Sequence, residues 1–416
     1  MPFSIAPVSG DRTQRILAVL FFIAVLFPYL TPFKTAFDTQ PWALLVSFAV
    51  ALTFFDIPRP LFPLVFTAGY ASLILAIGLI RRVSSPIDGL RSLAGYLAVF
   101  FIAYAGYRLH KFISVKLFLA AVAIWLTVGI VQILFDPKFL NGLLPRVTAF
   151  NKGGRGVIAL APEPAYYVKV LIAFFVLNEI FFKEKRYGPG LYAAIFILIC
   201  VQIVISFAGI GIVFLAAAAV AKAISLIWEK TSKERAISAV LILVLIAAFA
   251  SFKTIPRLQK SRGGSFLSKA ISAPLTLYRR DYSTSGRLGN LVLGFYGGLI
   301  QTKGLGFGLG TKTQGPIPPW LGRTIGARRK WGGRISGGLV QGVYELGAVG
   351  LLFFFSPLWI IGWSIVKNRD QRSALWLTLC LVYPIAAIAE SPAFPLFGYL
   401  LGVHVYYLKK NGGKDA

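Results

Sequence analysis

The sequence contains few of the residues that most metal and redox sites require. Its 416 residues include two cysteines, two histidines and one methionine, and Asp and Glu together number 15. Cys200 and Cys380 both lie inside apolar runs, so neither a disulfide framework nor a cysteine metal site is expected. Two histidines are too few for imidazole-rich zinc or di-iron chemistry. We therefore expect a protein with no metal site and no cofactor.

The overall composition is that of a membrane protein. Hydrophobic residues make up 57% of the chain and charged residues 14%, well below the ~25% of ordinary soluble domains. This excludes a single soluble domain, a disordered chain and a coiled coil, and it predicts an all-α polytopic membrane protein. Lys and Arg number 43, which gives a net charge of +28.

Apolar runs that could form membrane-spanning helices occur about twelve times, with 11 to 13 as the range. They cover residues 16–33, 41–56, 61–80, 92–108, 115–135, 165–182, 190–206, 208–228, 236–252, 337–366, 373–390 and 392–408. No such run occurs between residues 253 and 336. We therefore divide the chain into nine helices in 1–252, a large loop in 253–336, and three helices with a tail in 337–416.

The distribution of Lys and Arg predicts the orientation. The short loops on one side hold 18 of these residues and those on the other side hold 8, so the first side should be cytoplasmic, with both termini inside. The long loop then lies outside the cytoplasm. It carries 15 Lys and Arg against one acid, Asp281, and this excess suggests an anionic partner at the outer membrane surface.

One group of candidate site residues precedes the sixth apolar run. Lys152 and Arg155 flank two glycines and suit phosphate, and Glu163 comes directly before Pro164, which favours a helix start. Glu163 is either a carboxylate that interacts with the helix dipole or a general base for a sugar hydroxyl. Two interpretations of Lys169 also stay open, because it could reach the surface or neutralise Glu163. Lys222, near a helix end, is expected to reach the surface.

A second group lies in the long loop. There Arg279, Arg280 and Arg287 surround Asp281, the only acid of the loop. Arginine binds phosphate through two parallel hydrogen bonds and keeps its charge, so this group suits a pyrophosphate. The alternative is an amphipathic surface segment. The candidate residues for binding pyrophosphate or glycan, from both groups and their surroundings, are Arg146, Lys152, Arg155, Arg279, Arg280, Asp281, Tyr282 and Arg334.

Two further features lie before the apolar run 337–366 and at its start. The glycine-rich segment 304–310 lacks the spacing and the strand–helix context of a nucleotide loop, and it is more typical of a tight turn. In the following helix, Gly338, Gly342 and Glu345 share one face. Glu345 is either a structural hydrogen-bonding group between helices or a functional carboxylate. The candidate catalytic residues are therefore Arg287, Glu163 and Glu345.

In this order, four short motifs resemble those of the O-antigen polymerase and ligase superfamily, which includes related exopolysaccharide polymerases. They are Glu163-Pro164, Ser285-Gly-Arg-Leu288, Gly304-Leu-Gly-Phe-Gly308 and Val343-Tyr-Glu-Leu-Gly347. The likeness covers about residues 150–355 by motif and the rest by hydropathy. The resemblance implies a fold with a large outer loop, similar to that of the GT-C glycosyltransferases. At the positions of the ligase His-Asn pair this chain has Ser336 and Gly337, which favours polymerase over ligase.

The resemblance implies a bacterial inner-membrane enzyme that moves a growing glycan from undecaprenyl pyrophosphate to a lipid-linked repeat unit. Its partners would be undecaprenyl-pyrophosphate-linked oligosaccharide, membrane lipid, a chain-length regulator and a flippase, with no nucleic acid. Fixed cations would stabilise the departing pyrophosphate without a metal. The alternatives are a ligase for a different lipid acceptor, a flippase or transporter of lipid-linked oligosaccharides, and a non-enzymatic scaffold that docks on anionic lipid.

Overall fold

The computed structural model is helical throughout the part of the chain that it describes. The described residues are 10–31, 39–54, 56–80, 85–145, 147, 156–229, 231–272, 282–311, 335 and 337–412, and no strand occurs among them. Eight of their helices are long and apolar enough to cross a membrane, and two more apolar helices are shorter. The prediction of an all-helical polytopic membrane protein is confirmed at this level. The count of twelve spans stays a prediction.

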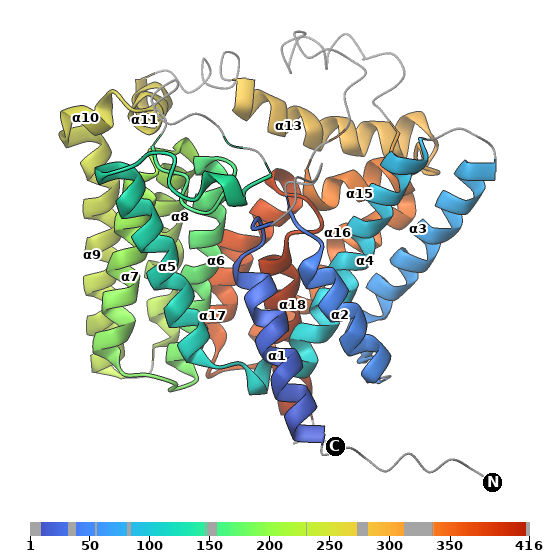
Figure 1. Cartoon of the computed structure of the whole chain (residues 1–416), viewed down its shortest axis with the longest axis horizontal. Helices are drawn as coiled ribbons and strands as arrows, with labels where there is room; N and C mark the ends of the chain where they lie inside the picture. Colours follow the sequence, from blue (N-terminus) through green and yellow to red (C-terminus); the bar gives the residue numbers. More distant parts are fainter. Residues whose placement is uncertain are drawn as a thin grey trace.

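The first half of the chain forms nine helices that run back and forth through one bundle (Figure 1). They are α1 (Gly10–Leu26), α2 (Trp42–Thr53), α3 (Phe62–Ile80), α4 (Pro86–Leu109), α5 (Val115–Leu134), α6 (Pro164–Lys183), α7 (Pro189–Ile205), α8 (Gly209–Ser225) and α9 (Ser232–Thr254). Proline stands in the first turn of α4, α6 and α7, where its fixed φ suits the helix and its missing N–H leaves no bond unmade.

The long loop of the sequence analysis contains short helices at one end of the bundle. These are α10 (Pro256–Gln259), α11 (Arg262–Ser272) and α13 (Tyr282–Phe295), which continues as a π-helical segment over Tyr296–Gln301. Figure 1 shows α13 lying across this end of the bundle, above α15 (Gly338–Leu346). We call it the α13 end; α1 begins and α18 (Pro395–Gly412) ends at the opposite end.

The run 337–366 is not one helix, contrary to the sequence prediction. It forms α15 and then α16 (Ala348–Lys367), with a break at Gly347, whose φ is +59°. A side chain at position 347 would collide with the carbonyl oxygen of Gly304. The break exists because the glycine-rich segment packs against it: Phe307 and Gly308 donate backbone hydrogen bonds to the carbonyls of Tyr344 and Glu345, and Ala348 donates to Gly304.

The next apolar run also departs from a regular helix. It begins as α17 (Arg372–Leu377) and contains two π-helical segments, Thr378–Val382 and Ile385–Ala389. The second segment ends at Glu390, whose N–H bonds the carbonyl of Ile385. π-Helical turns are rare and occur often at functional sites.

The core of the bundle centres on α6, in which every side chain from Tyr167 to Phe181 is buried. The sequence analysis predicted that Lys222 of α8 reaches the surface, and this prediction is wrong. Lys222 is 1% exposed and its Nζ lies 2.9 Å from Oε1 of Glu179 in α6. A buried carboxylate on the neighbouring helix, which one-dimensional hydropathy cannot reveal, holds this lysine inside.

Candidate functional site

A polar cavity of about 460 Å³ opens among the helix ends beneath α13. Its wall is formed by α4 between Arg91 and Ile102, by the first turns of α6 and α15, by α13, and by the chain between Ile388 and Pro395. The polar and charged residues that line it include Arg91, Glu163, Lys169, Arg287, Asn290, Gln341 and Glu390. Concave sites with a few convergent polar groups are the usual form of a small-ligand site.

One wall of the cavity is an ion pair between α6 and the end of the π-helical segment. The Nζ of Lys169 lies 2.6 Å from Oε2 of Glu390, and both side chains are 2% exposed. The same nitrogen donates to the carbonyl of Ala389 at 2.9 Å and lies 4.2 Å from the centre of the Tyr166 ring. The end of the π-helical segment thus directs the Ala389 carbonyl and the Glu390 carboxylate toward Lys169.

Arg287 reaches this cavity from α13. Asn290, one turn further along the same helix, also lines it and is 4% exposed. Arg287, Glu163 and Glu390 are all close enough to Lys169 to interact with it electrostatically. Residues from three separate parts of the chain, the start of α6, α13 and Glu390, are therefore grouped in one charged site.

Glu163 stands at the N-terminal boundary of α6 with an extended backbone, φ −148° and ψ 155°. Its carbonyl accepts the N–H groups of Tyr166 and Tyr167, but its side chain makes no capping hydrogen bond to the helix. The half-buried side chain lines the cavity instead. Its role is therefore not that of a helix cap.

Glu345 lies behind the cavity wall and does not line it. Its carboxylate is 1% exposed. It accepts hydrogen bonds from Ser92 Oγ at 2.7 Å, Tyr96 OH at 2.6 Å, Gln341 Nε2 at 2.8 Å and the N–H of Gly310 at 3.0 Å. These donors join α4, α15 and the glycine-rich segment. The arrangement favours the structural interpretation of Glu345, one of the two that the sequence left open.

The glycine-rich segment has a backbone that other residues rarely adopt. Gly304, Gly306, Gly308 and Gly310 all have φ between +72° and +87°. A side chain at Gly306 would meet the backbone of Glu345 and Gly347. The glycines serve close packing between backbones, as the tight-turn interpretation predicts.

The structure thus brings together two of the three candidate catalytic residues, Arg287 and Glu163. Most of the candidate binding residues lie outside the described residues: Arg146, Lys152, Arg155, Arg279, Arg280, Asp281 and Arg334. Tyr282 begins α13, and its side chain is likewise not described.

The sequence analysis did not select Glu390, Arg91, Asn290 and Gln341. Glu390 carried a signal, because it is an acid at the end of an apolar run. The sequence left open whether Lys169 reaches the surface or neutralises Glu163. In the structure Lys169 is buried and pairs with Glu390, and Glu163 is close enough to interact with it electrostatically. Neither Asn290 nor Gln341 differs in sequence from an ordinary polar helix residue.

Among the described residues, no three His, Cys, Asp or Glu side chains are grouped as a metal site. No protein-family model matches this chain, and no curated protein matches it in sequence.

Proposed function

We propose that the protein is a glycosyltransferase that polymerises glycan from a lipid-pyrophosphate-linked donor, with its reaction in the cavity beneath α13. The observation that carries the proposal is the grouping of Arg287, Arg91 and Glu163 around one space next to a neutralised Lys169–Glu390 pair. Because Glu390 compensates Lys169, the net charge of these groups comes from two arginines and one glutamate. This combination suits an anionic donor and a neutral hydroxyl acceptor.

The arginines account for the pyrophosphate. A guanidinium stays charged and can bind two phosphate oxygens at once. Negative charge grows on the pyrophosphate as its bond to the sugar breaks, and cations fixed in place stabilise that charge without reorganising. Arg287 of α13 and Arg91 of α4 approach the cavity from different helices, as a clamp on two linked phosphates would require.

Glu163 accounts for the acceptor. In the proposed step the acceptor hydroxyl oxygen forms a bond to the anomeric carbon of the donor glycan. The bond between that carbon and the pyrophosphate oxygen breaks, and its electron pair stays on the pyrophosphate. The hydroxyl proton passes to the Glu163 carboxylate, which is half-buried and lines the cavity.

The proposal includes an orientation in a bacterial inner membrane, with the α13 end outside the cytoplasm. The orientation rests on the short loops expected from the sequence, in which 18 Lys and Arg fall on the side of the two termini and 8 on the other side. The donor would be undecaprenyl-pyrophosphate-linked oligosaccharide, supplied by a flippase, and a chain-length regulator would act on the product.

The test is a membrane reconstituted with the purified protein and a single lipid-linked repeat unit, without nucleotide sugar, with and without EDTA. A ladder of products in EDTA supports the proposal. One discrete transfer to an added lipid core would identify a ligase, and labelled lipid that crosses the bilayer without growing would identify a flippase. Growth that strictly requires magnesium would overturn the arginine clamp, and no transfer or transport at all would favour a scaffold.

A further inference from the structure

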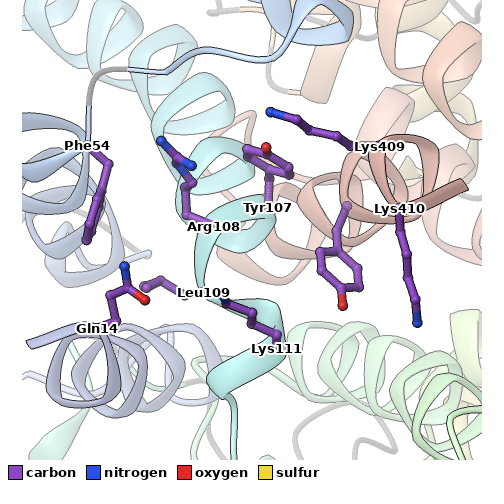
Figure 2. Close-up of a pocket in the computed structure, with 9 residues that line it drawn as sticks. Gln14, Phe54, Tyr107, Arg108, Leu109, Lys111, Lys409 and Lys410 are labelled. Atoms are coloured by element: carbon purple, nitrogen blue, oxygen red, sulfur yellow. The ribbon is translucent and has the colours of Figure 1, made fainter. Parts of the chain in front are cut away.

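A second cavity, of about 310 Å³, lies at the opposite end of the bundle (Figure 2). Its wall comes from the end of α4 and the turn that follows, the last turns of α18, the start of α1 and the residue after α2. It is lined by Gln14, Phe54, Tyr107, Arg108, Leu109, Lys111, Tyr406, Lys409 and Lys410. Four of these nine residues are basic and none is acidic.

Aromatic rings hold part of this positive charge in place. Figure 2 shows the Tyr107 ring between Arg108 and Lys409. The guanidinium carbon of Arg108 lies 5.6 Å from the centre of the Phe54 ring, and Lys409 Nζ lies 5.6 Å from the centre of the Tyr107 ring. A cation over an aromatic face keeps its charge and loses conformational freedom. Lys111 Nζ likewise lies 4.5 Å from the centre of the Phe112 ring. Three of the four cations are thus preorganised before any ligand arrives.

One nearby acid neutralises only part of the charge. Asp56 lies 3.1 Å from Lys409 Nζ and 3.8 Å from Arg108 Nη1. The hydrogen bond and charge of Lys409 hold the pKa of this carboxyl below its usual value. Within the described residues Lys111 and Lys410 have no acidic partner, so the cavity has a surplus of positive charge that an anion would compensate.

The surroundings of the cavity identify the source of that anion. The outward faces of α1 and α2 are apolar beside it, with Ile16 53%, Leu20 51% and Leu52 57% exposed. Figure 1 shows α1 running from this end of the bundle along its side. Acyl chains would lie against the exposed apolar residues of α1 and α2. A basic pocket between helix ends, next to an apolar face, matches both parts of a phospholipid.

We propose that this cavity binds the phosphate headgroup of an anionic membrane lipid, with Lys111 and Lys410 as the main charge partners and the acyl chains against α1 and α2. The site lies at the other end of the molecule from the cavity beneath α13. It does not depend on the proposed glycosyltransferase activity.

Native mass spectrometry of the full chain in detergent, titrated with phosphatidylglycerol, tests the proposal. The double variant Lys111→Gln/Lys410→Gln should weaken binding of the first lipid about 30-fold, since each lysine near a headgroup contributes ~1 kcal/mol and 1.4 kcal/mol is tenfold. The matched control is Lys116→Gln/Lys185→Gln, which changes two exposed lysines of the same end that do not line the cavity. It should bind like the wild type.

Two further arms define the ligand. Phosphatidylethanolamine, which is zwitterionic, should bind more weakly than phosphatidylglycerol to the wild type. Inorganic phosphate should not displace the bound lipid at equal concentration, because it has no acyl chains. Equal lipid binding by wild type and Lys111→Gln/Lys410→Gln would overturn the site, and displacement by phosphate alone would show a soluble-anion site instead.

Discussion

The ammonium nitrogen of Lys169 lies 2.6 Å from a carboxylate oxygen of Glu390, although 221 residues separate the two in the chain. The pair joins the centre of the bundle to the end of a π-helical segment and forms one wall of the charged cavity. Because both groups are buried, each depends on the other for compensation of its charge.

We predict that Lys169→Met and Glu390→Gln each destabilise the protein by ~3–5 kcal/mol, because each leaves a buried charge without its partner. The double variant should lose less than the sum of the two changes. Thermal unfolding in detergent measures all three, with the exposed Lys116→Met as the control, which should stay within ~0.5 kcal/mol of the wild type. Strictly additive losses would show that the pair is not a unit.

Arg287→Ala should nearly abolish glycan growth. The loss of a buried charged contact costs ~2–5 kcal/mol, which corresponds to a fall in rate of ~30-fold or more. Arg287→Lys keeps the charge but loses the forked geometry, and its rate should be intermediate or as low. Lys269→Ala removes an exposed cation from α11 at the same end and should leave the rate unchanged. Glycan of normal length from both Arg287 variants would rule out the assignment.

The same substitution should mainly lower the reaction rate at Glu163 and mainly lower the stability at Glu345. Glu163→Gln should lower the rate by ~10²–10⁴, the usual contribution of a general base, with little change in the melting temperature. Glu345→Gln should destabilise the protein by ~1.5–3 kcal/mol, because a buried carboxylate loses charged hydrogen bonds, and should lower the rate less than Glu163→Gln does. Rate and melting temperature, measured on the same preparations, distinguish the two roles, and a stable but inactive Glu345→Gln would reverse them.

Gly347, at the start of α16, and Gly362, inside it, allow the same substitution to be compared at a strained and at an open position. Gly347→Ala should destabilise the protein by at least ~1–3 kcal/mol, because φ is +59° and the new methyl group would meet the carbonyl oxygen of Gly304. Gly362→Ala, where no atom lies within 4 Å of the added carbon, should stabilise the helix by ~0.5–1 kcal/mol. Thermal unfolding of both variants tests the helix break, and equal behaviour would contradict it.

The orientation can be tested by cysteine labelling after Cys200 and Cys380 are replaced. Lys303→Cys, at the α13 end, should react with an impermeant thiol reagent in intact cells. Lys185→Cys, at the opposite end, should react only after lysis. The reverse result would place the charged cavity in the cytoplasm and remove the case for an outer-face reaction.

The parts of the fold that hydropathy governs were predictable from the sequence. The apolar run 165–182 became α6, with one residue of difference at each end. The break at Gly347 was not predictable, because it depends on the backbone of Gly304, 43 residues earlier, which packs against it. A hydropathy pattern contains no information on the positive φ of Gly347.

The candidate site was predictable only where a charge stood in an unusual place. Glu163 before a proline and Arg287 among arginines carried such signals, and both line the cavity. The pairing of Lys169 with Glu390 could not be predicted from the sequence. The π-helical segment that positions Glu390 has the composition of an ordinary apolar helix.

Hydrogen bonds to Glu345 connect residues that line the cavity with the glycine-rich segment 304–310. Ser92 and Gln341 line the cavity and also donate to Glu345, which in turn accepts the N–H of Gly310. A ligand that accepted the single hydroxyl hydrogen of Ser92 would withdraw this donor from Glu345, the carboxylate that also accepts the N–H of Gly310.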